Sequence, residues 1–273
     1  AIKLHGKEMS YLNLFDTEAA WRLVHSMGEE PTVAVIKHAN PCGVSSHHDI
    51  TEAYIRANAC DPVSAFGGIV AVNKEVSGSM ADELAKVFTE VVVAPSFTQE
   101  AISKLTEKKN IRIIEAHPPG FPLLDMRSLD GGLLVQTCDR LQLDHSQWTI
   151  ATDREPTESE WIDLDFAWRV AAKVSSNCIV LAKDKQALGI GAGQQNRRDA
   201  GVIAAEKANG RAKGGVCASD AFFPFTDGLD AAIDAGCTAV IQPGGSIRDQ
   251  EVIDAANEAG LAMVFTGERH FKH

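Results

Sequence analysis

The chain has 273 residues, of which 45% are hydrophobic, and carries a formal net charge of −11 from 37 acidic and 26 basic residues. This length and apolar content exclude a disordered chain and a small disulfide-stapled domain. The negative charge disfavours nucleic acid as a partner, because the surface as a whole repels phosphate backbones, and a small anionic ligand would need a local cluster of basic groups.

The cysteines and the apolar runs indicate the compartment. Six cysteines, at positions 42, 60, 138, 178, 217 and 237, include no C-x-x-C pair, which fits reduced thiols better than a disulfide framework. No stretch approaches the ~18 to 20 consecutive apolar residues of a membrane helix, and nothing at the start resembles a signal peptide. We therefore predict a cytoplasmic protein without a membrane partner. The chain starts at Ala1 rather than Met, as a piece of a longer protein would.

Strand-like and helix-like patterns alternate over the first 116 residues. A turn built from Asn40, Pro41 and Gly43 is expected directly after the first strand. This alternation predicts an α/β domain whose largely parallel sheet is covered by helices. The predicted strands are 31–37, 67–73, 91–95 and 111–116, and the predicted helices are 49–60, 78–90 and 98–110.

Residues 117–132 are rich in proline and glycine and are predicted to form a loop, followed by a strand at 132–138. A helix is predicted over 157–177, where Thr157 and Glu160 form a capping box, and then two strands flank a turn at 183–185. The order βαβ returns near the end, with helices at 227–236 and 246–260 and strands at 237–243 and 261–267. Two α/β subdomains, split near residues 145–155, describe this pattern.

Lys37 and His38 end an apolar strand in the stretch "VAVIKHANPCGVSS". Either residue alone would be read as a solvated cation or a structural histidine. Together they favour catalysis, because the neighbouring ammonium favours a neutral imidazole that can accept a proton near pH 7. A zinc deaminase site is disfavoured, since Asn40 stands at the position of its proton-carrying Glu and Cys42 has no partner cysteine three residues on.

Three further strand ends carry glycine-rich turns, where open α/β sheets commonly place ligands. "SAFGG" spans residues 64–68, "GIGAGQQNRR" spans 189–198, and "QPGGSIRD", a possible phosphate nest, spans 242–249. The second segment fits a site for a planar polar ligand or a phosphate, or a glycine-rich turn whose arginines face water, and the third also fits a plain change of chain direction. The segment "ASDAFFPFTDG" fits a core plug or an apolar wall for a flat heterocycle, and the final "GERHFKH" supplies Arg269 and Phe271.

These stretches together resemble one family, the AICAR transformylase domain of the bifunctional purine-biosynthesis enzymes (PurH/ATIC family). The motifs "KHANPCG", "DPVSAFGGIVA", "SSNCIVLAKD", "GIGAGQQNRRD", "ASDAFFPF", "DAGCTAVIQPGGSIRD" and "MVFTGERHFKH" match in order, from near residue 8 to the end. The resemblance implies formyl transfer from 10-formyltetrahydrofolate to the 5-amino group of AICAR. It also implies a homodimer with interface active sites and two cytidine-deaminase-like α/β subdomains with mostly parallel sheets, at 1–148 and 149–273, with the upstream IMP cyclohydrolase domain absent from this chain.

The same resemblance implies roles for individual residues. His38 would take the amine proton, Lys37 would stabilise the oxyanion or protonate the departing N10, and Asn177 would orient the amine and carboxamide. A potassium ion near Asp220 is also possible in this family. AICAR would contact Asn13, Gly67, Glu90, Arg197, Phe222 and Arg269, and the folate would contact Pro224, Phe225 and Asp227.

Two departures and two alternatives accompany this interpretation. The family's Arg-Tyr-Gly-x-Asn-Pro-His-Gln segment, with another phosphate-binding Arg, would lie upstream of Ala1, and Thr226 replaces an Arg near the folate. The first alternative is a non-catalytic purine-nucleotide binding module, which would bind AICAR without formyl transfer. The second is metal-assisted hydrolysis or deamination of a nucleotide, which requires stoichiometric zinc.

Overall fold

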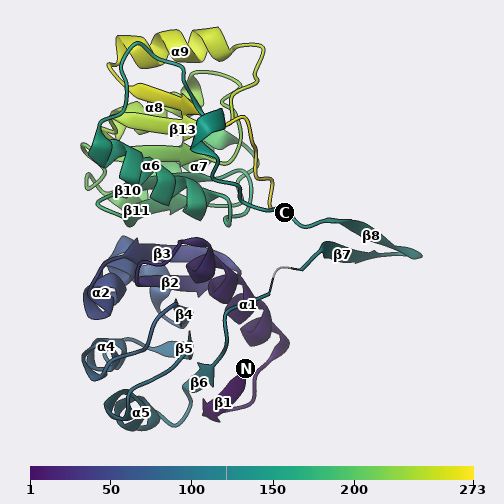
Figure 1. Ribbon diagram of the computed structural model, residues 1–273, viewed down its shortest axis with the longest axis vertical. Helices are drawn as coiled ribbons and strands as arrows, with labels where there is room; N and C mark the ends of the chain where they lie inside the picture. The colour runs from purple at the N-terminus through teal and green to yellow at the C-terminus, as the bar shows by residue number, and fades with distance from the viewer. Residues whose placement is uncertain (121) are drawn as a thin grey trace.

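A computed structural model describes residues 1–120 and 122–273. Within them, one twelve-stranded sheet runs through the whole molecule, and a separate two-stranded hairpin stands beside it (Figure 1). In spatial order the sheet contains β1 (Ile2–His5), β6 (Arg112–Glu115), β5 (Thr89–Ala94), β4 (Gly68–Val72), β2 (Thr32–Lys37), β3 (Asn40–Ser46), β11 (Gln186–Gly191), β10 (Ile179–Lys183), β12 (Val216–Ser219), β13 (Ala239–Gln242), β14 (Ala262–Phe265) and β9 (Thr149–Ile150).

Helices cover both faces of the sheet, and the two faces are built differently. On one face a single apolar core includes residues of α1 (Tyr11–Ser26), α6 (Glu158–Ala171) and strands of both halves. On the other face each half has its own core. Strand β2 serves both faces, since Ala34 and Ile36 join the shared core while Val33 and Val35 point to the other side. The second face carries α2 (Ile50–Cys60), α4 (Gly78–Leu84) and α5 (Gln99–Thr106), then α7 (Arg197–Ala208), α8 (Asp227–Asp234) and α9 (Asp249–Glu258).

Helices and strands around one sheet confirm the α/β class. The sheet itself is mixed, because it contains antiparallel as well as the predicted parallel pairs. Parallel pairs join β4, β5 and β6 towards one end and β12, β13 and β14 towards the other. The centre is antiparallel, because the hairpins β2–β3 and β10–β11 meet there through β3 and β11. A largely parallel sheet therefore describes these two outer blocks and not the centre. The subdomain boundary after residue 148 and the cytidine-deaminase likeness stay predictions.

Most predicted elements are found with shorter bounds. Thr157 and Glu160 form the expected capping box at the start of α6, and Asp184 and Lys185 form the turn between β10 and β11. The predicted helix at 78–90 ends at Leu84, because Thr89 and Glu90 already belong to β5.

Two expectations were wrong, and one long helix was missed. Residues 40–43 do not form a turn but begin β3, and the turn lies at His38 and Ala39 instead. Helix α1 was not predicted, because its apolar residues are not confined to one face. The predicted loop at 117–132 contains the strand β7 (Leu124–Leu129), which pairs with β8 (Gly132–Thr137); Phe121 of that loop lies outside the described residues.

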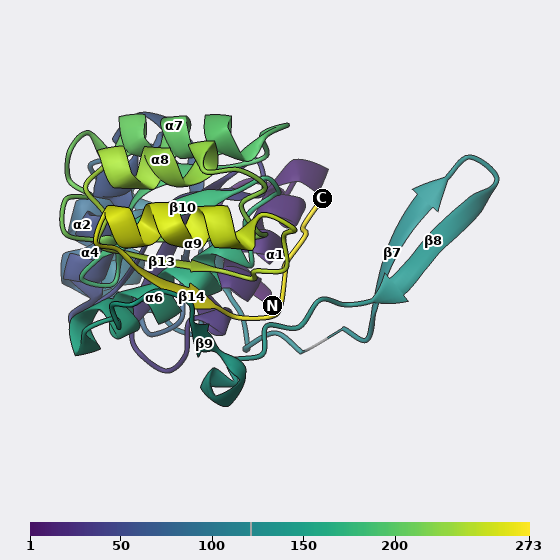
Figure 2. The same cartoon turned by 90° about the horizontal axis from the view of Figure 1, so that it is seen from above.

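The β7–β8 hairpin extends away from the body of the molecule in both views (Figures 1 and 2). All residues of both strands are exposed. The short 3₁₀ helix η1 (His145–Gln147) follows the hairpin, and α3 (Pro62–Ala65) precedes β4. Among the helices described, none has the length and apolar character needed to cross a membrane.

Candidate active site

The candidate residues gather along one edge of the sheet. Strand β2 ends and β3 begins at this edge, and in the second half β10 begins where β11 and β12 end. The antiparallel pairing of β3 with β11 places the two hairpins side by side. The sheet therefore brings the Lys37–His38 motif to the same edge as the segments preceding β10 and following β12.

The Lys37–His38 motif spans the end of β2 and the two-residue hairpin turn that follows it. His38 and Ala39 have φ values of 56° and 59°, as both central residues of a type I′ turn require. Left-handed backbone costs a non-glycine residue about 1 to 2 kcal/mol, so outside contacts must hold this turn. The Asp16 carboxylate of α1 does so by accepting hydrogen bonds from the His38 N–H at 3.0 Å and the Ala39 N–H at 2.9 Å.

The two side chains of the motif differ in their surroundings. The His38 imidazole is exposed at the tip of the turn. Lys37 is half-buried, and its Nζ donates to the Phe66 carbonyl at 2.9 Å. Since an ammonium has three donors, Lys37 keeps donors for a ligand while its position is fixed. Gly67 follows Phe66 with a φ of +77°, which requires glycine's freedom.

Asn13 and Glu90 are brought together at the N-terminal end of α1. The Asn13 Nδ2 donates to Glu90 Oε2 at 2.8 Å, and Arg112 donates to the same oxygen at 3.3 Å. Asn13 also completes a capping box with Ser10. Two of the predicted AICAR contacts in the first half, Asn13 and Glu90, thus form a connected polar group with Arg112 at the start of β5.

Asn177 lies in the segment before β10. Its Nδ2 donates to the Gln194 carbonyl at 2.9 Å, and the backbones of these residues exchange hydrogen bonds. The preceding Ser175 donates its N–H to Oδ1 of Asn40 at 2.8 Å. Asn40 follows the His38–Ala39 turn, so the segment bearing Asn177 is tied directly to the motif bearing His38.

A buried ion pair lies behind Asn177. Arg197 begins α7 and donates from Nη2 to Oδ1 of the fully buried Asp220 at 2.7 Å. The same oxygen accepts the Cys178 N–H at 3.0 Å, and Oδ2 accepts the Ser176 hydroxyl. The predicted ligand contact Arg197 is therefore engaged by a protein carboxylate, and Asp220 holds both neighbours of Asn177.

The aromatic segment after β12 combines both interpretations offered by its sequence. Phe223 is fully buried and plugs the core, whereas Phe222 and Pro224 are half-buried. Phe225 is 51% exposed, and the Arg248 guanidinium lies 4.8 Å from its ring centroid. Asp227 is exposed at the start of α8. The predicted folate contacts thus line an accessible surface beside the buried plug.

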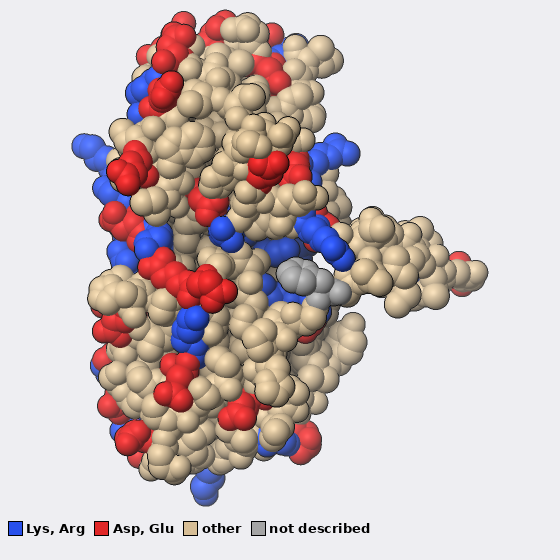
Figure 3. Space-filling view, viewed as in Figure 1, with Lys and Arg blue, Asp and Glu red and all other residues tan. Residues whose placement is uncertain are grey.

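Arg269 lies in the C-terminal segment, next to the base of the hairpin. Its exposed guanidinium packs 5.2 Å from the ring centroid of Phe271. Arg269 and Arg140 line a hollow together with His270, whose Nδ1 lies 2.8 Å from the Asp139 carboxylate. Figure 3 shows Lys and Arg gathered where the two halves meet beside the hairpin, which supplies the local positive charge that an anionic ligand needs.

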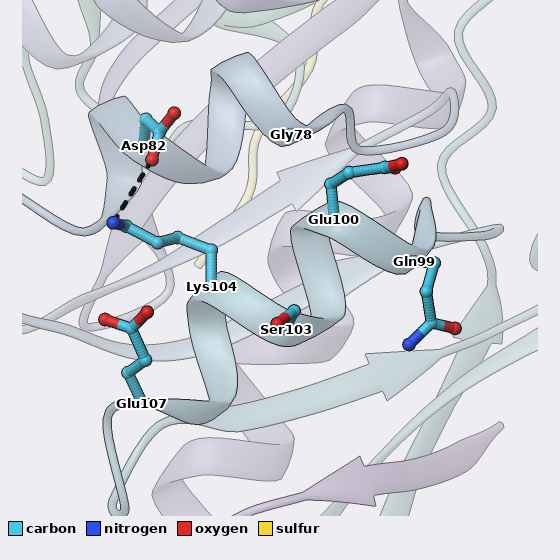
Figure 4. A pocket seen from close by; sticks show the side chains of 7 residues that line it. All are labelled: Gly78, Asp82, Gln99, Glu100, Ser103, Lys104 and Glu107. Atoms are coloured by element: carbon cyan, nitrogen blue, oxygen red, sulfur yellow. Dashed lines mark ion pairs between the residues drawn. The ribbon is translucent and has the colours of Figure 1, made fainter.

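Two other features do not belong to this site. In the predicted phosphate nest, the N–H groups of Gly245 and Ser246 donate to the Asp249 carboxylate at 2.6 and 3.1 Å. A carboxylate of the same loop therefore occupies the donors that a phosphate would use. The hollow between α4 and α5 is lined by surface residues such as Asp82 and Lys104, an ion pair at 3.4 Å (Figure 4).

Sequence reasoning missed Asp16, Asn40 and Lys272 as parts of the site. Asp16 and Asn40 act through contacts with residues 38, 39 and 175, and Lys272 contacts Ala39. No local pattern relates such distant positions. Over the part of the chain that is described, no group of three or more His, Cys, Asp or Glu side chains is arranged to hold a metal ion.

The fold and this edge define an α/β protein with a candidate site that joins an exposed His38 turn, preceded by the half-buried Lys37, to a buried Arg–Asp pair. Residues 1–207 match the model of the AICARFT/IMPCHase bienzyme family, and the chain belongs to that family. Its relatives include the bifunctional purine biosynthesis proteins PurH of Anoxybacillus flavithermus (52% identical), Acetivibrio thermocellus (51%) and Bacillus cereus (52%). Each match covers 100% of this chain and 54% of the relative, so the chain spans about half their length.

Proposed function

We propose that this chain transfers the formyl group of 10-formyltetrahydrofolate to the 5-amino group of AICAR, in the synthesis of IMP. One observation carries the proposal beyond family membership. The exposed His38 turn is tied to the segment bearing Asn177 by the 2.8 Å hydrogen bond between Asn40 and Ser175. A base and an orienting amide from the two halves of the chain are thereby held at one edge.

The reaction requires a base and an electrophilic group. The amine of AICAR attacks the formyl carbon, the bond from that carbon to N10 breaks, the amine loses one proton and N10 gains one. We assign the first proton transfer to His38, whose imidazole is exposed at the tip of the turn. Lys37, with its free donors, would stabilise the oxyanion or protonate N10.

The binding roles follow the same edge. Asn13, Gly67 and Glu90 would bind AICAR from the first half, and Arg197, Phe222 and Arg269 from the second. The contact of Asn13 with Glu90, and the 3.4 Å hydrogen bond from Arg197 to the Phe222 carbonyl, support this grouping. The half-buried Pro224 and the exposed Phe225 and Asp227 would meet the folate.

A potassium ion at the Asp220 side chain has weaker support. Its two carboxylate oxygens already accept hydrogen bonds from Arg197, Cys178 and Ser176. The guanidinium neutralises the charge that would attract a cation. Potassium therefore stays a prediction, and no step of the proposed reaction depends on it.

A homodimer with active sites at its interface is part of the proposal. On one face of the β7–β8 hairpin, exposed Leu124, Met126, Leu133 and Val135 side chains lie together. A lone hairpin is marginal in water, so we propose that the second protomer covers this apolar face. The base of the hairpin adjoins Arg269, which brings the interface close to the candidate site.

Met126→Asp is expected to yield monomers in sedimentation, whereas Asp125→Asn, on the opposite face of the hairpin, is expected to yield dimers. A dimer unaffected by Met126→Asp would contradict this arrangement.

The experiment that tests the proposed function is an absorbance assay for tetrahydrofolate release from purified chain, AICAR and 10-formyltetrahydrofolate. Release that depends on both substrates is expected. AICAR binding without release would favour the nucleotide-binding module instead. Stoichiometric zinc in elemental analysis would favour the hydrolytic or deaminating alternative.

A cytoplasmic location is also part of the proposal. The six free cysteines support it, because reduced thiols are typical of that compartment.

A further inference from the structure

Lys272 contacts the neighbours of two candidate catalytic residues at once. Its side-chain Nζ donates to the Ala39 carbonyl at 3.2 Å and to the Lys173 carbonyl at 2.8 Å. Its own carbonyl accepts the Ser176 N–H at 2.8 Å, and Ser175 and Lys272 form an isolated parallel bridge. Ala39 follows His38 and Ser176 precedes Asn177, so a single residue joins the two segments.

The Lys272 side chain is partly buried. Burial lowers the pKa of Lys272, and the neighbouring positive charge of Lys173 adds to this effect. An ammonium in such surroundings gains most from carbonyl acceptors, because few water molecules remain to solvate it. The backbone around Lys272 is fixed as well, since the His270 N–H donates to the Asp220 carbonyl at 3.1 Å.

The turn that bears His38 is held from two directions. The Asp16 carboxylate binds the two N–H groups of the turn, and Lys272 binds its Ala39 carbonyl. The contact from Asp16 comes from α1 in the first half, whereas Lys272 belongs to the last segment of the second half. Asp16 can thus set the turn's shape, while Lys272 can set its position relative to Asn177.

We propose that Lys272 is a positioning residue that holds the His38 turn in register with the segment bearing Asn177. The inference rests on the proposed function and deepens it, because it assigns the alignment of base and orienting amide to a residue outside both motifs. Lys272 donates to backbone carbonyls and need not touch either substrate. Because misplacing a catalytic group by about 1 Å can cost ~10²-fold in rate, loss of this contact should act on turnover more than on binding.

The test compares Lys272→Met, Lys272→Arg and a matched control. Lys272→Met removes the ammonium and leaves the backbone bridge, whereas Lys272→Arg keeps a cationic donor. Lys183→Met is the control, because Lys183 Nζ also donates to a backbone carbonyl, that of Lys213 at 3.0 Å, without joining the two halves. We expect kcat to fall ~10-fold in Lys272→Met with KM for AICAR little changed, to recover in Lys272→Arg, and to stay unchanged in Lys183→Met.

A second readout separates this inference from the proposed function. Amide hydrogen exchange at His38 and Ala39 is expected to accelerate in Lys272→Met at an unchanged thermal midpoint, and to stay slow in Lys183→Met. If the wild-type chain releases no tetrahydrofolate, the proposed function fails and the exchange rates still decide whether Lys272 holds the turn. Unchanged exchange at both amides, or a rise in KM with kcat unchanged, would overturn the inference.

Discussion

The two halves of the sheet present opposite strand ends at the candidate site. Strands β4, β5 and β6 begin at this edge, whereas the parallel strands β12, β13 and β14 end there. The rule that α/β proteins bind ligands at the carboxyl ends of parallel strands therefore describes the second half alone. The first half reaches the same edge through the β2–β3 turn and the start of α1.

The halves also differ in how they hold their candidate residues. His38 is exposed on a turn held by backbone contacts, while Arg197 and Asp220 are buried and paired. An exposed imidazole can meet a substrate and exchange protons, and a buried ion pair can keep neighbouring groups in fixed positions. Under the proposed function, the exposed turn of the first half would perform the proton transfer, and the buried pair of the second half would hold the neighbours of Asn177 in place.

The greatest loss of activity should come from a substitution in the first half. His38→Ala should lower kcat for formyl transfer by about 10²- to 10⁴-fold, the usual contribution of a general base. Lys37→Ala should act in the same direction. Because His38 is exposed, the thermal midpoint should not change, and His48→Ala, which removes another exposed imidazole, serves as the control. A wild-type rate in His38→Ala would refute the catalytic assignment.

In the second half, the largest effect should be on stability. Asp220→Ala leaves the Arg197 guanidinium buried without its partner, which should cost about 3 to 5 kcal/mol of unfolding free energy in urea denaturation. Glu18→Ala, which breaks the exposed pair with Arg22, should cost less than about 1 kcal/mol. Equal losses of unfolding free energy in the two variants would show that the buried Arg197–Asp220 pair does not stabilise the second half.

The dependence of stability on pH tests a second charged interaction in the second half, that of Glu160 with Arg154. Burial of Glu160 opposes its ionisation, but hydrogen bonds from Arg154, Thr238 and Thr157 outweigh this and lower its pKa to about 2. A carboxyl that ionises more readily when folded stabilises the protein above the unfolded pKa near 4.5, and this contribution disappears as the pH falls towards 2.

Glu160→Gln should accordingly cost about 1 to 3 kcal/mol at pH 7 and flatten the loss of stability between pH 4.5 and pH 2. Urea denaturation at several pH values measures both effects. Glu52→Gln in the first half, on the exposed side of α2, is the matched control and should keep the wild-type profile. An unchanged pH profile in Glu160→Gln would show that the ionised Glu160 carboxylate does not stabilise the fold.

The smallest expected effect concerns binding in the first half. Glu90→Gln weakens the contact with Asn13, so KM for AICAR should rise by about 2- to 10-fold, the value of one hydrogen bond. Because the Glu90 side chain is 38% exposed, stability should change little. Titration of AICAR in the formyl-transfer assay measures the effect, and an unchanged KM would remove Glu90 from the proposed site.

The α/β class, most of the helices and strands, and the family can be predicted from local sequence patterns alone. Periodicity and capping residues act over a few positions, as the capping box of Thr157 and Glu160 shows, and the ordered motifs are long enough to identify relatives. The sequence also indicated the residues proposed for catalysis and binding, because their resemblance to the family lies in contiguous motifs.

Which of these residues lie together, and which contacts hold them there, depends on how distant segments pack. The turn at His38 and Ala39 has left-handed backbone without glycine, and its stabilising carboxylate comes from Asp16 in a helix that the pattern did not reveal. Likewise, Lys272 reaches Ala39 across 233 positions in the chain. Such contacts arise from the packing of elements distant in sequence, and no local pattern of residue types encodes them.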